Sequence, residues 1–260
     1  MRSVSTGPFK RKWPAFVGFS CHFQPGAVRR RGLGEVAIKL LDDSHALHEY
    51  EILRSLKHPN LASAFAYFRE KGNSCIVMSY HKGCTLTQAV LKKGSFSEEL
   101  AKEHFRGLLR AVDYLHQHRI MHSDVKTDNI MCQPGLTLVD FGSACWLDME
   151  PRPSSSTYDF TAPEVLDGEP PSEKHDVWGC GVCLYFMLRG QLAKKISFKG
   201  LSVDCSTVLA DALHLDKTLR CAPMILLQRP WLHDASLDEK GRSKSSRSGA
   251  RNAPKRGRFR

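Results

Sequence analysis

Ile-Met-His-Ser-Asp-Val-Lys-Thr-Asp-Asn, at residues 120–129, is the most informative segment of this 260-residue chain, and Asp-Phe-Gly follows at residues 140–142. Phosphoryl transfer requires a carboxylate that orients the attacking hydroxyl, oxygen ligands for magnesium and a cation for the phosphate. Asp124 is a candidate for the carboxylate, and Lys126, two residues later, for the cation. The segment therefore predicts a site for phosphate chemistry.

Asn129 and Asp140 are the candidates for the magnesium ligands, eleven residues apart. An isolated Asp-Phe-Gly arises often by chance, but the two motifs together, in this order, do not. The pair resembles the catalytic loop and the metal-binding triplet of the eukaryotic protein kinase family. The resemblance implies that Asp124 and Lys126 are catalytic and that ATP and Mg²⁺ are bound.

Composition limits the class of protein. A hydrophobic content of 42% is enough for a globular core, and the length suits one large domain or two lobes with a shared core. The sequence contains no run of eighteen apolar residues, so we expect no membrane span and no membrane partner. The bases near the N-terminus precede no apolar stretch, so a signal peptide is not expected.

The net charge of +11 is concentrated at the two ends. Residues 240–260 hold nine Lys or Arg and no acid, whereas residues 13–239 hold 25 bases against 27 acids. We therefore predict basic tails at 1–14 and 236–260, the second of them disordered. The kinase domain would occupy 15–235, with an N-lobe over about 15–80 and a C-lobe over about 84–235. A basic tail of this kind is typical of nucleic-acid binding, of nuclear targeting or of a simple solvated end.

Nine cysteines occur without a regular framework, which is typical of reduced thiols in a cytosolic or nuclear protein. Cys180 and Cys183 form a Cys-x-x-Cys pair, but no second pair lies at zinc-finger spacing. We interpret these two residues as buried packing cysteines.

Upstream of the catalytic segment, residues 35–41 are rich in β-branched residues and predict a strand. Its Val-Ala-Ile-Lys resembles the family's third strand, in which the lysine, here Lys39, contacts the α- and β-phosphates. A helical pattern follows from Ser44 to Leu56, with Ser44 as the expected N-cap. Glu49 matches the family's glutamate that pairs with this lysine, and Glu51, on another face of the helix, is the competing candidate.

The glycine-rich phosphate loop of the family is poorly conserved in this chain. Gly18 fits the first position of Gly-x-Gly-x-x-Gly, but Ser20 and Phe23 replace the second and third glycines. Glycine allows backbone amides to approach phosphate closely. We therefore expect a reshaped lid over the nucleotide, with ATP affinity rather than the fold in question.

Residues 75–80 read as a buried strand that ends at the hinge. The resemblance makes Met78 the gatekeeper and Ser79-Tyr80-His81 the hinge that contacts adenine. Residues assigned to the nucleotide on this basis are Lys39, Glu49, Gly18, Ala37, Met78, Tyr80 and Met131.

The second half of the chain matches the family in order. Helical patterns cover 86–91 and 98–118, and Asp176 resembles the aspartate that braces the catalytic loop. Arg229 stands where we expect an arginine that pairs with Glu164, the last residue of Ala-Pro-Glu. Between residues 191 and 228 the helical pattern is weak, which predicts an abbreviated C-lobe.

Two residues bear on specificity and regulation. Thr157, seven residues before Glu164, favours Ser/Thr over Tyr substrates by resemblance. Ser123 replaces the arginine that precedes the catalytic aspartate in kinases switched by activation-loop phosphorylation. The NF-κB-inducing kinase also lacks that arginine, and compact viral kinases have a similar length, so the subfamily stays open.

The expected fold is α+β, with a small antiparallel β-rich N-lobe and a mainly helical C-lobe. The expected function is ATP-dependent phosphorylation of Ser/Thr in protein substrates, in the cytoplasm or the nucleus. The alternative is a pseudokinase scaffold with weak nucleotide binding, which the degraded glycine loop favours and the complete set Lys39, Asp124, Asn129 and Asp140 opposes. A nucleic-acid partner would rest on the C-terminal tail alone.

Overall fold

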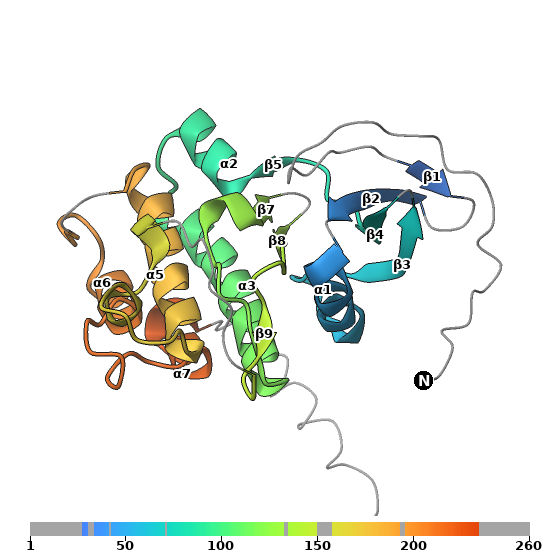
Figure 1. Ribbon diagram of the computed structural model, residues 1–260. Coiled ribbons are helices and arrows are strands. Elements are labelled where there is room, and N and C mark those ends of the chain that lie inside the picture. Colours follow the sequence, from blue (N-terminus) through green and yellow to red (C-terminus); the bar gives the residue numbers. More distant parts are fainter. Residues whose placement is uncertain are drawn as a thin grey trace, which may run out of the picture.

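The computed structural model describes residues 28–30, 34–41, 43–70, 72–132, 135–149, 158–192 and 196–233. It has an N-lobe, formed by β1–β4 and α1, and a mainly helical C-lobe that contains the other elements (Figure 1). Within these ranges no helix is long and apolar enough to cross a membrane. The predictions made for the two basic tails, for Gly18 and for Thr157 concern residues outside this part of the chain.

The N-lobe sheet is antiparallel in the order β1-β2-β4-β3. Its strands are β1 (Val28–Arg30), β2 (Gly34–Leu41), β3 (Ala64–Glu70) and β4 (Asn73–Ser79). The central strand β4 is buried from its second to its sixth residue, as its unbroken apolar run predicts. The sheet thus provides a rigid support for the side chains of β2.

Helix α1 (Asp43–Ser55) packs against β3 and β4. Its buried side chains recur at helical spacing, at Ala46, Glu49, Ile52 and Leu53. The helix begins one residue before Ser44, so the prediction of Ser44 as N-cap is wrong. The face that packs on the sheet also carries Glu49 and directs it inward.

The connection to the C-lobe runs through β5 (Cys84–Thr85) into α2 (Leu86–Lys93). The Thr85 side chain accepts a hydrogen bond from Gln88 N, and the Gln88 side chain accepts one from Thr85 N. This capping box fixes the start of α2. Strand β5 also pairs with β7 in the sheet β5-β7-β8, so that the connection is attached to the C-lobe.

The long helix α3 (Glu98–Gln117) and helix α5 (Glu173–Arg189) form the centre of the C-lobe. Buried α3 residues recur at helical spacing: Ala101, Phe105, Leu108, Leu109, Ala111, Val112 and Leu115. Helix α5 is buried from His175 to Leu188, including both Cys180 and Cys183. Burial raises the pKa of each of these thiols well above its usual value, which agrees with packing cysteines.

The remaining elements surround this centre (Figure 1). They are β6 (Ile120–Met121), η1 (Thr127–Asn129), β7 (Ile130–Cys132), β8 (Leu136–Leu138), β9 (Cys145–Trp146), η2 (Tyr158–Phe160), α4 (Pro163–Leu166), α6 (Val203–Ala212), α7 (Pro223–Leu227) and η3 (Pro230–Leu232). Where the helical pattern was weak, between residues 191 and 228, the described residues contain two short helices, α6 and α7, and residues 196–202 contain no helix.

The ion pair predicted between Glu164 and Arg229 is wrong. Arg220 takes that place: its two terminal nitrogens donate to the Glu164 carboxylate at 2.6 and 2.9 Å, and its side chain is fully buried. Arg229 lies 38% exposed and pairs instead with Asp211 at 2.7 Å. Arg220 lies in the segment between α6 and α7, and its further hydrogen bond to the main-chain oxygen of Lys174 holds it toward Glu164.

Candidate active site

The catalytic segment is held by a buried carboxylate of α5. Asp176 accepts hydrogen bonds from the main-chain N–H groups of His122, at 2.9 Å, and Ser123, at 2.8 Å. His116, in the last turn of α3, contacts the same carboxylate at 2.9 Å. Burial alone would raise the pKa of Asp176, but these hydrogen bonds and His116 lower it, so the group stays ionised. The bracing role predicted for Asp176 is thus observed.

The hydrogen bond from Ser123 N to Asp176 stabilises a strained backbone at Ser123. Ser123 adopts φ +64° and Asp140 φ +61°, a region that non-glycine residues enter at a cost of roughly 1–2 kcal/mol. The loop also lies directly on α5, because a Cβ added to Gly179 would stand 2.5 Å from the main-chain oxygen of Val125. Only glycine permits this close approach.

Asp124, Lys126 and Asn129 converge within the loop. Lys126 Nζ lies 2.7 Å from Asp124 Oδ2, and Asn129 Nδ2 donates to the same oxygen at 2.9 Å. Asn129 Nδ2 also donates to the main-chain oxygen of Asp124 at 2.9 Å. The Asp124 side chain is 14% exposed, so its carboxylate is oriented from two sides while it remains accessible.

Lys39 lies at the centre of a second cluster, between the lobes. Its Nζ donates to both oxygens of Glu49, each at 2.8 Å, and to Asp140 Oδ1 at 2.7 Å. Burial lowers the pKa of Lys39, but the two carboxylates outweigh it and leave that pKa raised. For Asp140, burial opposes ionisation and the neighbouring Lys39 prevails, so its pKa is lowered. Glu51 is exposed, and Glu49 is therefore the partner of the lysine.

The Asp-Phe-Gly triplet connects the two clusters. Phe141 is fully buried, and its ring meets that of His122 edge to face at 4.8 Å. Gly142 follows Phe141, and a Cβ added to it would stand 3.5 Å from Lys39 Nζ and 3.7 Å from Glu49 Oε2. The absence of a side chain keeps the space beside the lysine open.

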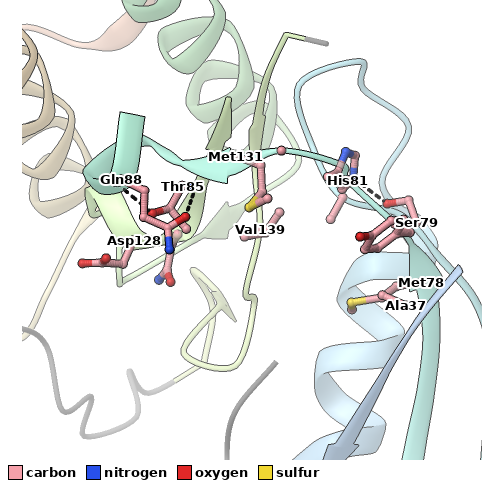
Figure 2. A pocket seen from close by; sticks show the side chains of 13 residues that line it. Ala37, Met78, Ser79, His81, Thr85, Gln88, Asp128, Met131 and Val139 are labelled. Carbon is pink, nitrogen blue, oxygen red and sulfur yellow. Dashed lines mark hydrogen bonds between the residues drawn. The ribbon is translucent and has the colours of Figure 1, made fainter. Parts of the chain in front are cut away.

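A pocket of about 400 Å³ opens between the lobes. Figure 2 shows Ala37 and Met78 on one side, from facing positions of β2 and β4, and Met131 with Val139 toward the C-lobe. Its lining comprises Ala37, Ala62, Met78, Ser79, Tyr80, His81, Gly83, Thr85, Gln88, Asp128, Asn129, Met131 and Val139. A mostly apolar pocket with a few polar groups in its lining is the usual form of a small-molecule site.

The residues assigned to the nucleotide fall into three groups. Ala37, Met78, Tyr80 and Met131 line the pocket. Lys39 and Glu49 lie in the ion cluster, apart from the lining, and Gly18 is not among the described residues. Three polar residues of the lining, Thr85, Gln88 and Asp128, were not predicted from the sequence. The capping-box spacing from Thr85 to Gln88 is the signal that would have found the first two.

At the hinge, Ser79 Oγ and His81 Nε2 lie 2.8 Å apart (Figure 2). The same Ser79 oxygen accepts a hydrogen bond from Ser63 N at 3.1 Å, and burial lowers the pKa of His81. The arrangement that satisfies all three groups has Ser79 donating its proton to a neutral His81. The side chains thereby fix the hinge backbone.

The two predicted metal ligands have suitable chemistry for magnesium. Asn129 uses its amide nitrogen within the loop, which leaves its amide oxygen for another partner, and the Asp140 side chain is 36% exposed. Carboxylate and amide oxygens suit Mg²⁺, which is usually held by one or two protein groups together with substrate phosphates. Among the described residues no group of three or more His, Cys, Asp or Glu could hold a metal ion by itself.

Comparison with known proteins gives a family match. A family model described as protein kinase domain matches residues 33–232. The human testis-specific serine/threonine-protein kinase 3 is 32% identical over 239 residues, which cover 79% of this chain and 89% of that protein.

Other relatives are longer. Sperm motility kinase 3A of Mus musculus is 31% identical over 74% of this chain and 42% of its own. The Arabidopsis thaliana SNF1-related protein kinase catalytic subunit alpha KIN12 is 28% identical over 77% and 46%. The chain thus spans less than half the length of these two proteins. With the catalytic motifs assembled as described, the chain belongs to the protein kinase family, as a serine/threonine kinase of the eukaryotic type.

Proposed function

We propose that the protein transfers the γ-phosphoryl group of ATP to Ser or Thr hydroxyls of protein substrates, with magnesium at Asn129 and Asp140. The observation that carries the proposal is the simultaneous assembly of two clusters. Lys39 is bonded to Glu49 and Asp140, and Asp124 is bonded to Lys126 and Asn129.

Asp124 is the group that orients the substrate hydroxyl and accepts its proton late in the transfer. Its hydrogen bonds with Lys126 and Asn129 restrict the carboxylate to one orientation. Lys126 then serves a second purpose, because its ammonium can neutralise charge on the phosphoryl group in transit. Magnesium, when bound, would supply charge neutralisation for the phosphates.

Lys39 must change partners when ATP binds. An ammonium has three donors, and all three are engaged, two with Glu49 and one with Asp140. A phosphate oxygen therefore reaches Lys39 only by replacing one of these acceptors. We expect it to replace Asp140, whose side chain is 36% exposed against 2% for Glu49.

The test is a radiolabelled ATP assay with a generic basic protein, in magnesium buffer, beside Asp124→Asn. This variant keeps the shape of the side chain and removes the base. We expect transfer by the wild-type protein and a loss of roughly 10²–10⁴-fold in the variant. Absence of transfer by the wild type, with ATP still raising its melting temperature, would instead establish the pseudokinase alternative.

We also propose that the Lys255-Arg256-Gly257-Arg258 run supports nuclear entry of an otherwise cytoplasmic protein. The support is compositional, since residues 240–260 hold nine bases and no acid. Deletion of 236–260 from a tagged protein should shift its distribution toward the cytoplasm. An unchanged distribution would remove the targeting role.

A salt series on the same two proteins tests nucleic-acid binding, whose affinity should fall steeply with salt only when the tail is present.

A further inference from the structure

Helix α1 contacts the start of the activation segment through a residue that the catalytic motifs do not include. His48, directly before Glu49, has its Nε2 3.0 Å from the main-chain oxygen of Ala144. A carbonyl only accepts, so His48 donates this hydrogen bond. The His48 ring also meets the Trp146 ring edge to face, with centroids 5.0 Å apart and an interplanar angle of 88°.

The residues that His48 touches are themselves tied to the catalytic loop. Trp146 belongs to β9, which pairs with β6 at Ile120, and Leu147 N donates to the main-chain oxygen of Arg119 at 2.8 Å. Strand β6 leads directly into the segment that carries Asp124. Contact with Ala144 and Trp146 therefore links α1 to a segment already fixed to the loop.

Elsewhere α1 packs mainly on its own lobe, against β3 and β4, and the Glu49 carboxylate also accepts a main-chain hydrogen bond from Phe141. The position of Glu49 relative to the C-lobe consequently depends on contacts across the interlobe boundary. One such contact passes through Lys39 to Asp140, and this is the contact that ATP is expected to open. His48 provides a second contact, one residue away, which involves neither ATP phosphate nor Lys39.

A feature of the loop makes this second contact important. Ser123 Oγ lies 4.0 Å from Cys145 Sγ, an uncharged pair at the position where phosphate-regulated kinases carry an arginine. Here the start of the activation segment is held by strand pairing and by His48. We infer that His48 is a positioning residue, which keeps Glu49 on Lys39 without a phosphorylated activation segment. The inference rests on the proposed kinase activity.

Three substitutions separate the two contacts of His48. His48→Gln keeps an N–H donor and loses the ring, His48→Phe keeps the ring and loses the donor, and His48→Ala loses both. Leu47→Ala is the matched control, because Leu47 neighbours His48 on α1 and is 50% exposed. Each full-length protein is assayed for kcat and KM with ATP and a basic protein substrate.

We expect His48→Ala to lower kcat on the order of tenfold, as the loss of one hydrogen bond and one ring contact would do. The kcat of His48→Gln and of His48→Phe should lie between that of His48→Ala and that of wild type, and the kcat of Leu47→Ala should match wild type. Hydrogen exchange on the nucleotide-free proteins should show faster exchange of α1 and of residues 143–147 in His48→Ala alone. Wild-type kcat with wild-type exchange in His48→Ala would overturn the inference. If the wild-type protein shows no kinase activity but His48→Ala still exchanges faster, the kinase proposal is refuted while the positioning role stands.

A second inference rests on strand register. Cys84 of β5 and Cys132 of β7 are directly opposite in the antiparallel pair, and both thiols are free. Opposite residues in such a pair have Cα atoms about 4.5–5.5 Å apart, within the range that a disulfide spans. Burial raises the pKa of Cys132 to about 12, with Cys84 as the second cause, so the less buried Cys84 is the thiol that meets an oxidant first. The next opposite pair, Thr85 and Met131, lines the pocket.

We propose that Cys84 and Cys132 form an oxidation site for peroxides. The Cys84 sulfur attacks the peroxide O–O bond, which gives a sulfenic acid and one water. The Cys132 sulfur then attacks the Cys84 sulfur and expels a second water. Two thiols and one hydrogen peroxide thus become a disulfide and two waters. The new bond would join the hinge connection to the C-lobe beside the pocket and restrict its opening.

The test treats the full-length protein with hydrogen peroxide, alkylates free thiols and identifies linked peptides by mass spectrometry. We expect a Cys84–Cys132 link in wild type, absent in Cys84→Ser and in Cys132→Ser. ATP turnover should fall several-fold in wild type alone and recover with dithiothreitol. Peroxide that leaves both thiols unlinked, or a link that leaves turnover unchanged, would overturn the proposal.

Discussion

An ionic cluster in the C-lobe and another between the lobes are built in opposite ways. In the C-lobe, Arg220 is fully buried and donates to both oxygens of Glu164 and to two main-chain oxygens, and its guanidinium lies over the Trp178 ring, 5.0 Å from the ring centroid. Between the lobes, a single ammonium, Lys39, is shared by the carboxylates of Glu49 and Asp140.

The two clusters differ in whether a charged group remains free to bind a ligand. Four of the five N–H donors of the buried Arg220 guanidinium have acceptors, so this group holds α4 against the segment before α7. The interlobe cluster has one more carboxylate than cations, and its Asp140 is 36% exposed. The interlobe cluster, with its accessible excess of negative charge, can take up a cation together with phosphate. The buried Arg220 cluster, whose charges are balanced, contributes to stability instead. Two experiments test this contrast, and two further experiments concern the hinge and the activation segment.

The largest expected effect is on catalysis. Lys39→Met and Asp140→Ala should each lower phosphoryl transfer by about 10³-fold, because each removes a charge that the transition state requires. Both proteins should remain folded. A pair of glutamates on α1 sharpens the result, since Glu49→Gln should also lose activity while the exposed Glu51→Gln should not. Equal activity of these two variants would contradict the assignment.

The next effect is on stability. Arg220→Met should lower the free energy of unfolding by about 3–5 kcal/mol, because it leaves a buried carboxylate without its partner. Arg229→Met is the control, because its pair with Asp211 is partly exposed, with side chains 38% and 24% exposed, and should be worth less, about 1 kcal/mol. Thermal and urea unfolding of the two variants measure the difference. Similar values for both would show that the two clusters do not differ as described.

A smaller effect concerns pH at the hinge. Burial lowers the pKa of His81 in the folded protein, while in the unfolded chain it is near 6.5. The unfolded state therefore binds the proton first, and stability is lost as the pH falls below about 6.5 and through the folded pKa. Urea unfolding at pH 7.5 and 5.5 should show a larger loss for wild type than for His81→Gln. Equal losses would place His81 in a solvent-like setting.

The smallest expected effect is that of activation-segment phosphate. The Ser123–Cys145 pair supplies no cation, and Lys126 is engaged with Asp124. Phosphatase treatment, or joint substitution of Ser154, Ser155 and Ser156 by Ala, should change the rate by less than about twofold, since phosphate would lack a charged partner. A large loss in both experiments would show that another group, such as Arg152, supplies the charge.

Much of the site could be predicted because its motifs are local. Asp124, Lys126 and Asn129 lie within six residues, so their spacing alone brings their side chains together. The pairing of Lys39 with Glu49 could be predicted because one strand and one helix carry them. The polar part of the pocket lining was missed, because Thr85 and Gln88 form the capping box of α2 and Asp128 lies in η1, so that all three also have ordinary structural roles.

The arginine partner of Glu164 was misassigned for a physical reason. Arg220 and Arg229 both follow α6 at plausible distances, and the sequence holds no signal for which of them turns inward. The choice depends on the segment between α6 and α7, whose hydrogen bonds from Arg220 to His214 and Lys174 form only after the lobe has packed. A contact across 56 residues is a tertiary result that local patterns do not encode.

The close contact between α5 and the catalytic loop also has a consequence for the order of folding. Ser123 keeps its unfavourable φ while Asp176, 53 residues later in the chain, holds its N–H, and Gly179 contacts the loop beside it. A loop that needs such a distant partner has no stable native form of its own. We therefore expect the catalytic loop to be a late event in folding, formed only after α3 and α5 have docked. A ribosome-bound chain that ends before α5 would carry every catalytic residue named above and no catalytic site.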